Sequence, residues 1–184
     1  MKIWSKILLL VLAANFAFAF LAEKLVQDAR AQVGQTLFYD PSYSRLAYPI
    51  GDVDMIKGVC TDVVVRALRG QDIDLQRLIH EDMSANFSVY PKNWGAKKTD
   101  KNIDHRRVSN IATYLKRKGY EAKGEFKAGD IVTWRLDNGR PHIGIVSDKF
   151  VGGKTPLVIH NIGLGAQEED VLNVYEITGH FRIK

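Results

Sequence analysis

Cysteine and histidine are the residue types in this sequence that could carry out nucleophilic chemistry. The chain contains one cysteine, which lies in Gly58-Val59-Cys60-Thr61-Asp62 directly before a helix-like run. A thiolate at a helix N-terminus is stabilised by free backbone N–H groups and by the helix dipole. The same N–H groups can form an oxyanion hole for a tetrahedral intermediate. The position of Cys60 therefore indicates a nucleophile, although a lone cysteine is also an ordinary small core residue.

A nucleophilic cysteine needs a general base, normally a histidine that a third polar group holds in one tautomer. Two histidines lie on strands that we predict in the second half of the chain. His142 begins the segment His-Ile-Gly-Ile-Val, and His160 ends the segment Leu-Val-Ile-His 18 residues later. A helix N-terminus packed against these strands would bring Cys60, His142 and His160 together, although the spacing alone leaves this open.

The hydrophobic periodicity predicts the elements that must position these residues. Apolar residues recur at helical spacing before residue 120, which predicts helices over residues 23–33, 61–69, 75–83 and 105–118. Short β-type runs and a hairpin turn at Asn138-Gly139 follow, which predicts strands over residues 131–136, 142–147, 156–161, 171–177 and 180–183. This order indicates an α+β fold in which N-terminal helices pack on an antiparallel sheet.

The N-terminus has the composition of a secretory signal peptide. Lys2 and Lys6 flank the start of an apolar run over residues 7–14 that is too short to span a bilayer, and Ala17 and Ala19 are the small residues that a signal peptidase recognises. We therefore predict a signal peptide over residues 1–19, export to the periplasm, and no stable membrane span after cleavage. Residues 20–184 are then expected to form a single catalytic domain. An uncleaved N-terminal anchor is the alternative.

The net charge of the chain is modestly positive. The formal charge is +5 at pH 7, and removal of Lys2 and Lys6 would lower it to +3. A charge of this size suits approach to an anionic polymer such as the cell wall, but it is well below the footprint of a nucleic-acid-binding domain. We therefore predict no nucleic-acid partner.

Three segments of the second half form a recognisable pattern, namely Gly129-Asp130-Ile131-Val132-Thr133-Trp134, His142-Ile143-Gly144-Ile145-Val146 and Val158-Ile159-His160. They resemble the C-terminal half of NlpC-type papain-like cysteine peptidases. The resemblance implies a papain-like fold in which Cys60 attacks an amide carbonyl, His142 is the base and His160 orients its imidazole. It also implies that the substrate is the peptide stem of peptidoglycan, that the intermediate is a thioester, and that no metal or other cofactor takes part.

The same resemblance suggests residues of the substrate site. In that group a tyrosine twelve residues before the nucleophile often lines the substrate site, and Tyr48 stands at this offset. Asp62 replaces the Ser or Ala that is usual two residues after the nucleophile. It is either a favourable acidic residue in the first helical turn or a substrate contact. Asn161 is either a turn residue or a support of the site from behind. Tyr48, Asp62 and Asn161 are the candidate substrate-binding residues.

A second resemblance covers the chain from about residue 25 to the C-terminus. It rests on the segments Tyr48-Pro49-Ile50-Gly51-Asp52, Gly58-Val59-Cys60-Thr61-Asp62, His80-Glu81-Asp82-Met83, Asn102-Ile103-Asp104-His105-Arg106-Arg107, His160-Asn161-Ile162-Gly163 and Gly179-His180-Phe181-Arg182. These segments are similar to the family called domain of unknown function 1287. The second resemblance therefore predicts the family of the chain. It does not imply an activity, so the expected activity rests on the resemblance to NlpC-type enzymes.

Other polar clusters have more ordinary interpretations. His80-Glu81-Asp82 with His105 fits no zinc-binding spacing, so we predict no metal site. Arg106 and Arg107 open the predicted helix over residues 105–118. They are expected to form ion pairs with acidic residues, namely Asp52, Asp54 or Glu81. Alternatively, they hold a substrate carboxylate, which suits the geometry of arginine.

These patterns favour an exported cysteine hydrolase, that is, a peptidase or amidase of peptidoglycan stem peptides. Two alternatives remain open at this point. The same apparatus would also serve an acyltransferase or an amidase for another amide. A non-enzymatic cell-wall-binding module would instead contain Cys60 as a buried, inert residue. Peptidoglycan or its fragments are the expected partner in each wall-directed case, and a regulatory protein is compatible with all three.

Overall fold

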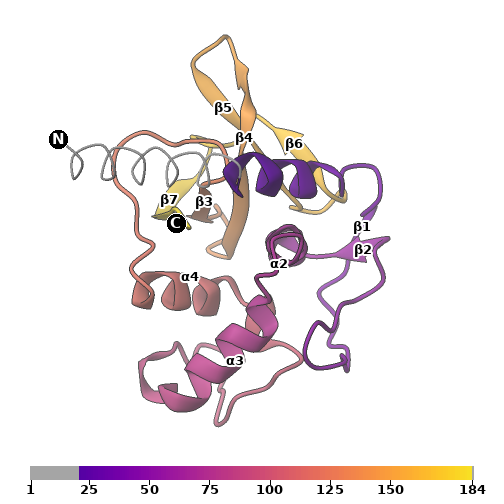
Figure 1. The fold of residues 1–184 in the computed structure, drawn as a ribbon, viewed down its shortest axis with the longest axis vertical. Helices are drawn as coiled ribbons and strands as arrows, with labels where there is room; N and C mark the ends of the chain where they lie inside the picture. The colour runs from indigo at the N-terminus through magenta and orange to yellow at the C-terminus, as the bar shows by residue number, and fades with distance from the viewer. Residues whose placement is uncertain (1–20, 184) are drawn as a thin grey trace, which may run out of the picture.

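The computed structural model describes residues 21–183. These residues form a helical layer packed on a five-stranded antiparallel sheet, so the predicted α+β class is confirmed (Figure 1). The predicted signal peptide at residues 1–19 lies outside the described residues. Within residues 21–183 no helix is long and apolar enough to cross a membrane.

The helical layer is built around one central helix. Residues 21–30 are helical, and α2 (Cys60–Arg69) packs on β4 of the sheet on one side and on α3 (Leu75–Ala85) on another, while α4 (Val108–Arg117) packs on α3 and on strands β4 and β7 (Figure 1). All residues of α2 from Cys60 to Leu68 are buried, because the helix is covered from both sides. This burial fixes the start of α2, and with it Cys60, against the sheet.

The predicted helix over residues 105–118 is interrupted. Residues Asp104–Arg106 form a short 3-10 helix, η2, and α4 begins only at Val108. The break occurs at Arg107, whose backbone is extended with φ −111° and ψ 115°. The buried Arg106 is held by bonds to distant parts of the chain, as described below, and a continuous helix would move it. Tertiary contacts therefore override the local helical pattern here.

The sheet has the strand order β6-β5-β4-β3-β7, and every neighbouring pair is antiparallel. Its strands are β3 (Ile131–Arg135), β4 (Pro141–Val151), β5 (Thr155–His160), β6 (Gln167–Glu169) and β7 (Glu176–Phe181). The hairpin predicted at Asn138-Gly139 joins β3 to β4, with Arg135 opposite Pro141. His142 thus lies at the start of the central strand, next to the hairpin.

The last predicted strands differ from the structure. Residues 171–174 form a turn rather than a strand, and the edge strand β6 precedes them. The turn is held by the Leu172 carbonyl, which accepts a hydrogen bond from Trp134 Nε1 at 3.0 Å. The indole of Trp134 is fully buried and needs an acceptor, so this side-chain bond takes the place of a strand pairing.

The sheet buries apolar side chains on both faces. The larger core lies between the helices and the sheet, and it includes Cys60 with Ile143 and Ile145 of β4. A smaller cluster around Trp134 and Val146 covers the opposite face. Residues alternate between faces along a strand, so His142 lies on the face opposite to Ile143.

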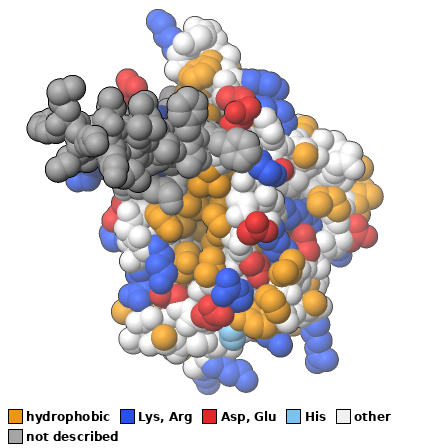
Figure 2. All heavy atoms as spheres, in the orientation of Figure 1, with side chains coloured by type: hydrophobic (Ala, Val, Ile, Leu, Met, Phe, Trp, Pro, Cys, Tyr) orange, Lys and Arg blue, Asp and Glu red, His pale blue; other side chains and the backbone are white. Residues whose placement is uncertain are grey.

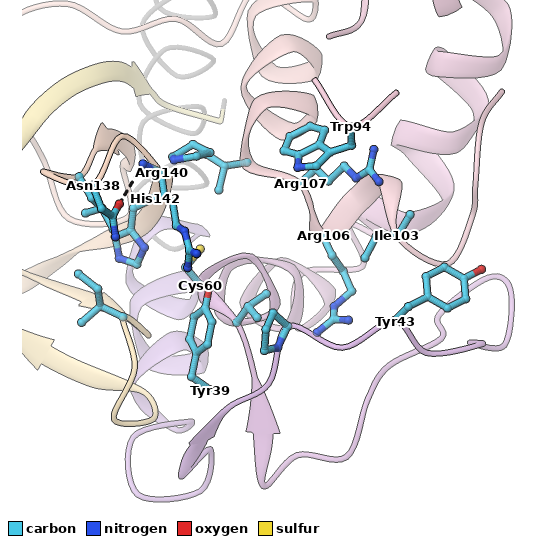
Figure 3. Close-up of a pocket in the computed structure, with 16 residues that line it drawn as sticks. Tyr39, Tyr43, Cys60, Trp94, Ile103, Arg106, Arg107, Asn138, Arg140 and His142 are labelled. Atoms are coloured by element: carbon cyan, nitrogen blue, oxygen red, sulfur yellow. Dashed lines mark hydrogen bonds between the residues drawn. The ribbon is translucent and has the colours of Figure 1, made fainter. Parts of the chain in front are cut away.

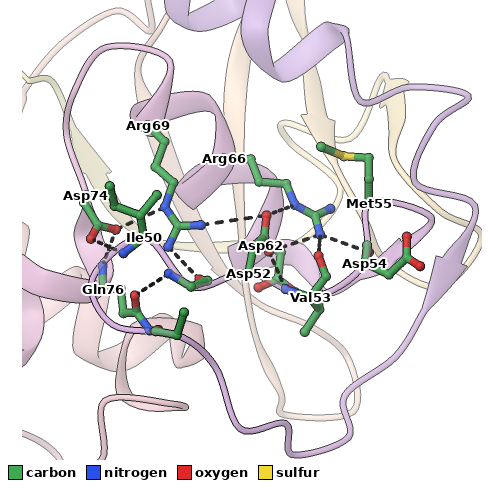
Figure 4. Close-up of polar contacts among 12 residues, drawn as sticks. Ile50, Asp52, Val53, Asp54, Met55, Asp62, Arg66, Arg69, Asp74 and Gln76 are labelled. Atoms are coloured by element: carbon green, nitrogen blue, oxygen red, sulfur yellow. Dashed lines mark hydrogen bonds and ion pairs between the residues drawn. The ribbon is translucent and has the colours of Figure 1, made fainter.

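A long loop between two short strands is fixed by an ion-pair network. Strand β1 (Phe38–Tyr39) pairs in parallel with β2 (Lys57–Gly58). Between them, Asp52 accepts a hydrogen bond of 2.8 Å from Arg66 of α2, and the Gly51 carbonyl accepts one of 2.8 Å from Arg69, which also pairs with Asp74 just before α3 (Figure 4). Because these arginines belong to α2, the network ties the loop, and through it β1 and β2, to the helix that begins with Cys60.

The surface charge is mixed. On the face shown in Figure 2, Lys and Arg side chains are spread over the molecule with acidic side chains among them. Many charged side chains of residues 21–183 form ion pairs, for example Arg77 with Glu81 and Arg135 with Glu176.

Candidate functional site

The N-terminus of α2 and the start of β4 open into one pocket. The cavity has a volume of about 660 Å³, and both Cys60 and His142 line it. Figure 3 shows Cys60, His142 and Tyr39 at one end of the pocket and Trp94 and Arg107 at the other. The remaining lining residues are Pro41, Tyr43, Val59, Ile103, Arg106, Val108, Leu136, Asn138, Arg140, Pro141 and Ile162. A nucleophile and a base candidate thus share a cavity large enough for a small ligand.

The two histidines predicted on neighbouring strands are in contact. His142 Nε2 lies 2.9 Å from His160 Nδ1, and the two rings meet edge to face. The ring of Trp134 stacks on the other side of His142 with a centroid distance of 5.6 Å. On the far side of His160, Nε2 lies 3.1 Å from the Glu169 carboxylate without hydrogen-bond geometry. Packing and hydrogen bonding therefore fix the orientation of His142.

Cys60 lies within the same pocket but is not hydrogen-bonded to His142. It is the first residue of α2 and is 5% exposed. The backbone N–H of Ile143, which follows His142 in the chain, acts on the sulfur. The thiol is thus next to the strand that carries His142, and a direct hydrogen bond between sulfur and imidazole is absent among the described residues.

The thiol and both imidazoles are neutral near pH 7. Burial raises the pKa of the Cys60 thiol to about 12, and the nearby Asp62 adds to this rise while the Ile143 N–H opposes it. Burial, followed by repulsion from His160 when that imidazole is protonated, lowers the pKa of His142 to about 3. Burial also lowers the pKa of His160, against the effect of Glu169. The expected stabilisation of a thiolate by the helix N-terminus is therefore outweighed by burial.

The raised thiol pKa predicts a distinct pH dependence of alkylation. Iodoacetamide reacts with the thiolate, which forms only as the pH approaches the pKa. The rate of alkylation of the folded chain is therefore expected to be low at about pH 7 and to rise steadily to about pH 10 without a plateau. The rate is measured by the mass shift of the intact chain.

The same chain unfolded in guanidinium chloride is the matched control. There the thiol is solvated, so the rate should level off above its ordinary pKa of about 8.5. A rate for the folded chain that is already high and constant from about pH 5 to 8 would contradict a neutral thiol and indicate a thiolate–imidazolium pair instead.

Asp62, a candidate substrate contact, does not line the pocket, and both oxygens of its carboxylate are hydrogen-bonded to groups of the protein. Its carboxylate accepts hydrogen bonds of 2.9 Å from Nε and Nη2 of Arg106, and one of 2.7 Å from the backbone N–H of Val59. Both side chains of this ion pair are at most 3% exposed. Arg106 therefore pairs with Asp62 and not with the predicted Asp52, which binds Arg66 instead.

Tyr48, the second candidate substrate contact, does not line the pocket. Its ring packs edge to face on His80 at a centroid distance of 5.3 Å. The tyrosine beside the nucleophile is Tyr39, because β1 pairs with β2 and places Tyr39 opposite Gly58. Burial raises the pKa of Tyr39, with a further contribution from Cys60, which reflects how close the two groups are. A parallel pairing of only two residues has no periodicity in the sequence, so Tyr39 could not be predicted as a residue of the site.

Asn161, the third candidate, has a positioning role in this structure. Its side-chain amide donates a hydrogen bond of 3.1 Å to the Gly58 carbonyl, and its Oδ1 accepts one from Gly163 N–H. The side chain is fully buried. Asn161 therefore joins the end of β5, which carries His160, to the strand that leads into Cys60.

Two arginines near the ends of predicted elements also contribute to the pocket. Arg107 and Trp94 line the pocket, where the guanidinium of Arg107 lies 4.4 Å above the indole ring. Arg140 also lines the pocket. The sequence did not predict this role, because an arginine next to a hairpin turn is usually only solvated. Within residues 21–183, no group of three His, Cys, Asp or Glu side chains is arranged to hold a metal ion.

Comparison with known proteins identifies the family of the chain. The family described as domain of unknown function (DUF1287) matches residues 26–183. The chain is 56% identical over 163 residues to "Uncharacterized protein YijF" of Escherichia coli (strain K12), an alignment that covers 86% of this chain and 80% of that protein. No solved structure matches the chain at a significant level. The family predicted from the sequence segments is confirmed, and the chain belongs to the DUF1287 family.

Proposed function

We propose that this chain is an exported cysteine hydrolase of papain-like, NlpC-type fold that cleaves amide bonds in peptidoglycan stem peptides in the periplasm. The observation that carries the proposal is the pairing of His142 with His160 at 2.9 Å in the wall of the pocket that contains Cys60. A base whose orientation is set by a third polar group, next to a cysteine at a helix N-terminus, is the arrangement that nucleophilic amide cleavage needs.

The contacts of His160 favour the tautomer that this chemistry requires. The Glu169 carboxylate, 3.1 Å away, favours a proton on His160 Nε2. His160 Nδ1 then accepts the proton that His142 donates from Nε2. The lone pair of His142 consequently lies on Nδ1, which has no hydrogen-bond partner among the described residues. His142 is therefore set up as a base, and His160 and Glu169 act on it as positioning residues.

Because the resting thiol is neutral, the proton moves during the attack and not before it. The Cys60 sulfur forms a bond to the amide carbonyl carbon while His142 accepts the thiol proton. The oxyanion is stabilised by the free N–H at the start of α2. His142 then protonates the departing amine, the C–N bond breaks, and a thioester remains on Cys60. Water attacks the thioester with His142 again as base, which releases a carboxylate and restores the thiol.

Absence of a sulfur–imidazole hydrogen bond is compatible with this sequence of steps. Catalytic hydrogen bonds are often long in the free enzyme and tighten when substrate binds. Substrate that fills the pocket also displaces water from the sulfur and the imidazole, which strengthens the attraction between thiolate and imidazolium. The stem peptide as substrate is supported by the resemblance to NlpC-type enzymes and by the positively charged lining of the pocket.

The proposal is tested by product analysis. Purified stem-peptide fragments are incubated with the mature chain and, as control, with the Cys60→Ala variant, and the products are analysed by mass spectrometry. We expect two fragments whose masses sum to that of the substrate plus one water, and none with the variant. Added hydroxylamine should trap the thioester as a hydroxamate. Unchanged fragments at high protein concentration would remove the hydrolase proposal.

One observation favours a second candidate, a cell-wall-binding module with an inert cysteine. Cys60 is buried and its pKa is raised to about 12, which also describes an ordinary core thiol. In that case the chain would bind stem peptides and leave their masses unchanged, and Cys60→Ala would bind equally well. The same mass spectra, combined with a binding measurement on both proteins, separate the two candidates.

A further inference from the structure

The pocket is lined by positive charge without any negative charge. Its lining includes three arginines and one histidine, but no aspartate and no glutamate. The charge of Arg106 is balanced by Asp62, with which it forms a buried ion pair. Arg107 and Arg140 have no carboxylate within 4 Å among residues 21–183. The pocket therefore contains two guanidinium groups that form no ion pair with a carboxylate of the described residues, although Arg107 is close enough to Asp104 to act against the rise that burial causes in the pKa of that carboxyl group.

An arginine without a carboxylate partner is unusual in this chain. Eight of the eleven arginines form ion pairs, namely Arg30, Arg66, Arg69, Arg77, Arg106, Arg117, Arg135 and Arg182. The three that do not, among the described residues, are Arg45, Arg107 and Arg140. Two of these three line the pocket that contains Cys60. The fold thus pairs its arginines in most places and leaves them available at the candidate site.

The two arginines occupy different ends of the pocket. Arg140 precedes Pro141 and His142 at the start of β4, and Figure 3 shows its side chain running from the hairpin toward Cys60. Its charge lowers the pKa of Tyr39, while burial of that phenol acts in the opposite direction and prevails. Arg107 is the residue that precedes α4, and its guanidinium is held 4.4 Å from the centre of the Trp94 ring. Arg140 is therefore near the sulfur, and Arg107 is placed to meet a more distant part of a ligand.

We propose that Arg140 and Arg107 bind carboxylate groups of the substrate, so that the pocket selects acidic peptides with free carboxylates over their carboxamide forms. A guanidinium binds a carboxylate through two parallel N–H···O bonds, which a neutral carboxamide cannot match. The inference rests on the proposed function and narrows its substrate. Stem peptides contain glutamate and diaminopimelate residues whose carboxylates are either free or amidated, and the pocket would take the free form.

Binding to an inactive variant tests this inference separately from catalysis. The Cys60→Ala chain is titrated with a stem peptide that has free carboxylates and with the same peptide carrying carboxamides, by isothermal titration calorimetry. Loss of a charge-assisted bidentate pair should weaken binding by about tenfold or more. We expect the free-carboxylate peptide to bind at least about tenfold more tightly, with a preference that shrinks as salt is added.

Substitution of the arginines shows which side chains cause the preference. Arg140→Gln and Arg107→Gln, each in the Cys60→Ala background, should weaken binding of the free-carboxylate peptide and leave the affinity for the amidated peptide nearly unchanged. Arg45→Gln is the matched control. Arg45 also lacks a carboxylate partner among the described residues, but it is exposed and does not line the pocket. This variant should keep the full preference.

The outcomes distinguish the inference from the proposed function. Equal affinity for the two peptides, or a preference that survives both Arg140→Gln and Arg107→Gln, would overturn carboxylate recognition even if the wild-type chain hydrolyses both peptides. A preference that both arginine variants reduce supports carboxylate recognition, even if the wild-type chain releases no product. In that last case the hydrolase proposal fails and the inference about the ligand stands.

Discussion

The double variant Cys60→Ala/His142→Ala is expected to be no less active toward a stem peptide than Cys60→Ala alone. Each single substitution should lower kcat/KM by about 10⁴-fold or more, because nucleophile and base act in the same proton-coupled step. Once the sulfur is absent, no thiol proton is left for the imidazole to accept, so removal of His142 should not lower the rate further. Rates are measured by quantifying released fragments, and folding of each variant is checked by urea denaturation.

His80→Ala is a suitable control for the loss of a histidine. His80 is only partly buried and packs on Tyr48 outside the pocket, so its removal should leave kcat/KM within about twofold of the parent. A folded His142→Ala variant that retains a tenth or more of the activity would exclude His142 as the base. Effects of Cys60→Ala and His142→Ala that multiply in the double variant would show that the two residues act independently.

The Asp62→Asn substitution is expected to reduce the free energy of unfolding by about 3–5 kcal/mol. Asp62 and Arg106 form an ion pair in which the Arg106 side chain is 2% exposed. The asparagine would leave the guanidinium charge buried and unpaired. Arg106 also donates to the carbonyls of Asp40 and Ser42, so the substitution should loosen the segment that leads from Tyr39 into the pocket wall.

Urea denaturation measures this loss, with Glu81→Gln as the control. The Arg77–Glu81 pair has side chains that are 45% and 54% exposed, and disruption of such a pair should cost less than about 1 kcal/mol. Similar losses for the two variants would mean that the Asp62–Arg106 pair contributes no more than an ordinary surface ion pair. A loss confined to Asp62→Asn would show that burial sets the size of the effect.

Much of the fold could be predicted because it depends on local pattern. Helix α2 has a run of apolar residues that starts at Val63 and is followed by the helix end at Gly70, and the hairpin at Asn138-Gly139 has a turn sequence that fixes the pairing of β3 with β4. The break at Arg107 and the turn at residues 171–174 could not be predicted in this way. They depend on the buried Arg106 and the buried Trp134, whose partners are distant in sequence.

The candidate site shows the same division. His142 and His160 both lie at strand ends on neighbouring antiparallel strands, so their contact follows from strand pairing once the sheet is known. The roles of Tyr39 and Tyr48 could not be separated by an offset in sequence, because a long loop lies between Tyr39 and Cys60 and only the pairing of β1 with β2 places Tyr39 beside the cysteine. The protonation state of Cys60 depends on burial, which a helix N-terminus does not reveal.

Burial of Cys60 has a consequence for its chemical lifetime. Thiolates react with peroxides and disulfides much faster than thiols do, and the oxidant needs access to the sulfur. A cysteine residue that is 5% exposed and whose thiol has a pKa of about 12 is poorly reactive toward both. The chain can therefore keep its single cysteine reduced in an oxidising medium without a second cysteine or a dedicated reductase. If Cys60 is the nucleophile proposed above, its reactivity would arise only in the presence of a ligand that fills the pocket, and the resting state would keep the thiol in an oxidation-resistant form.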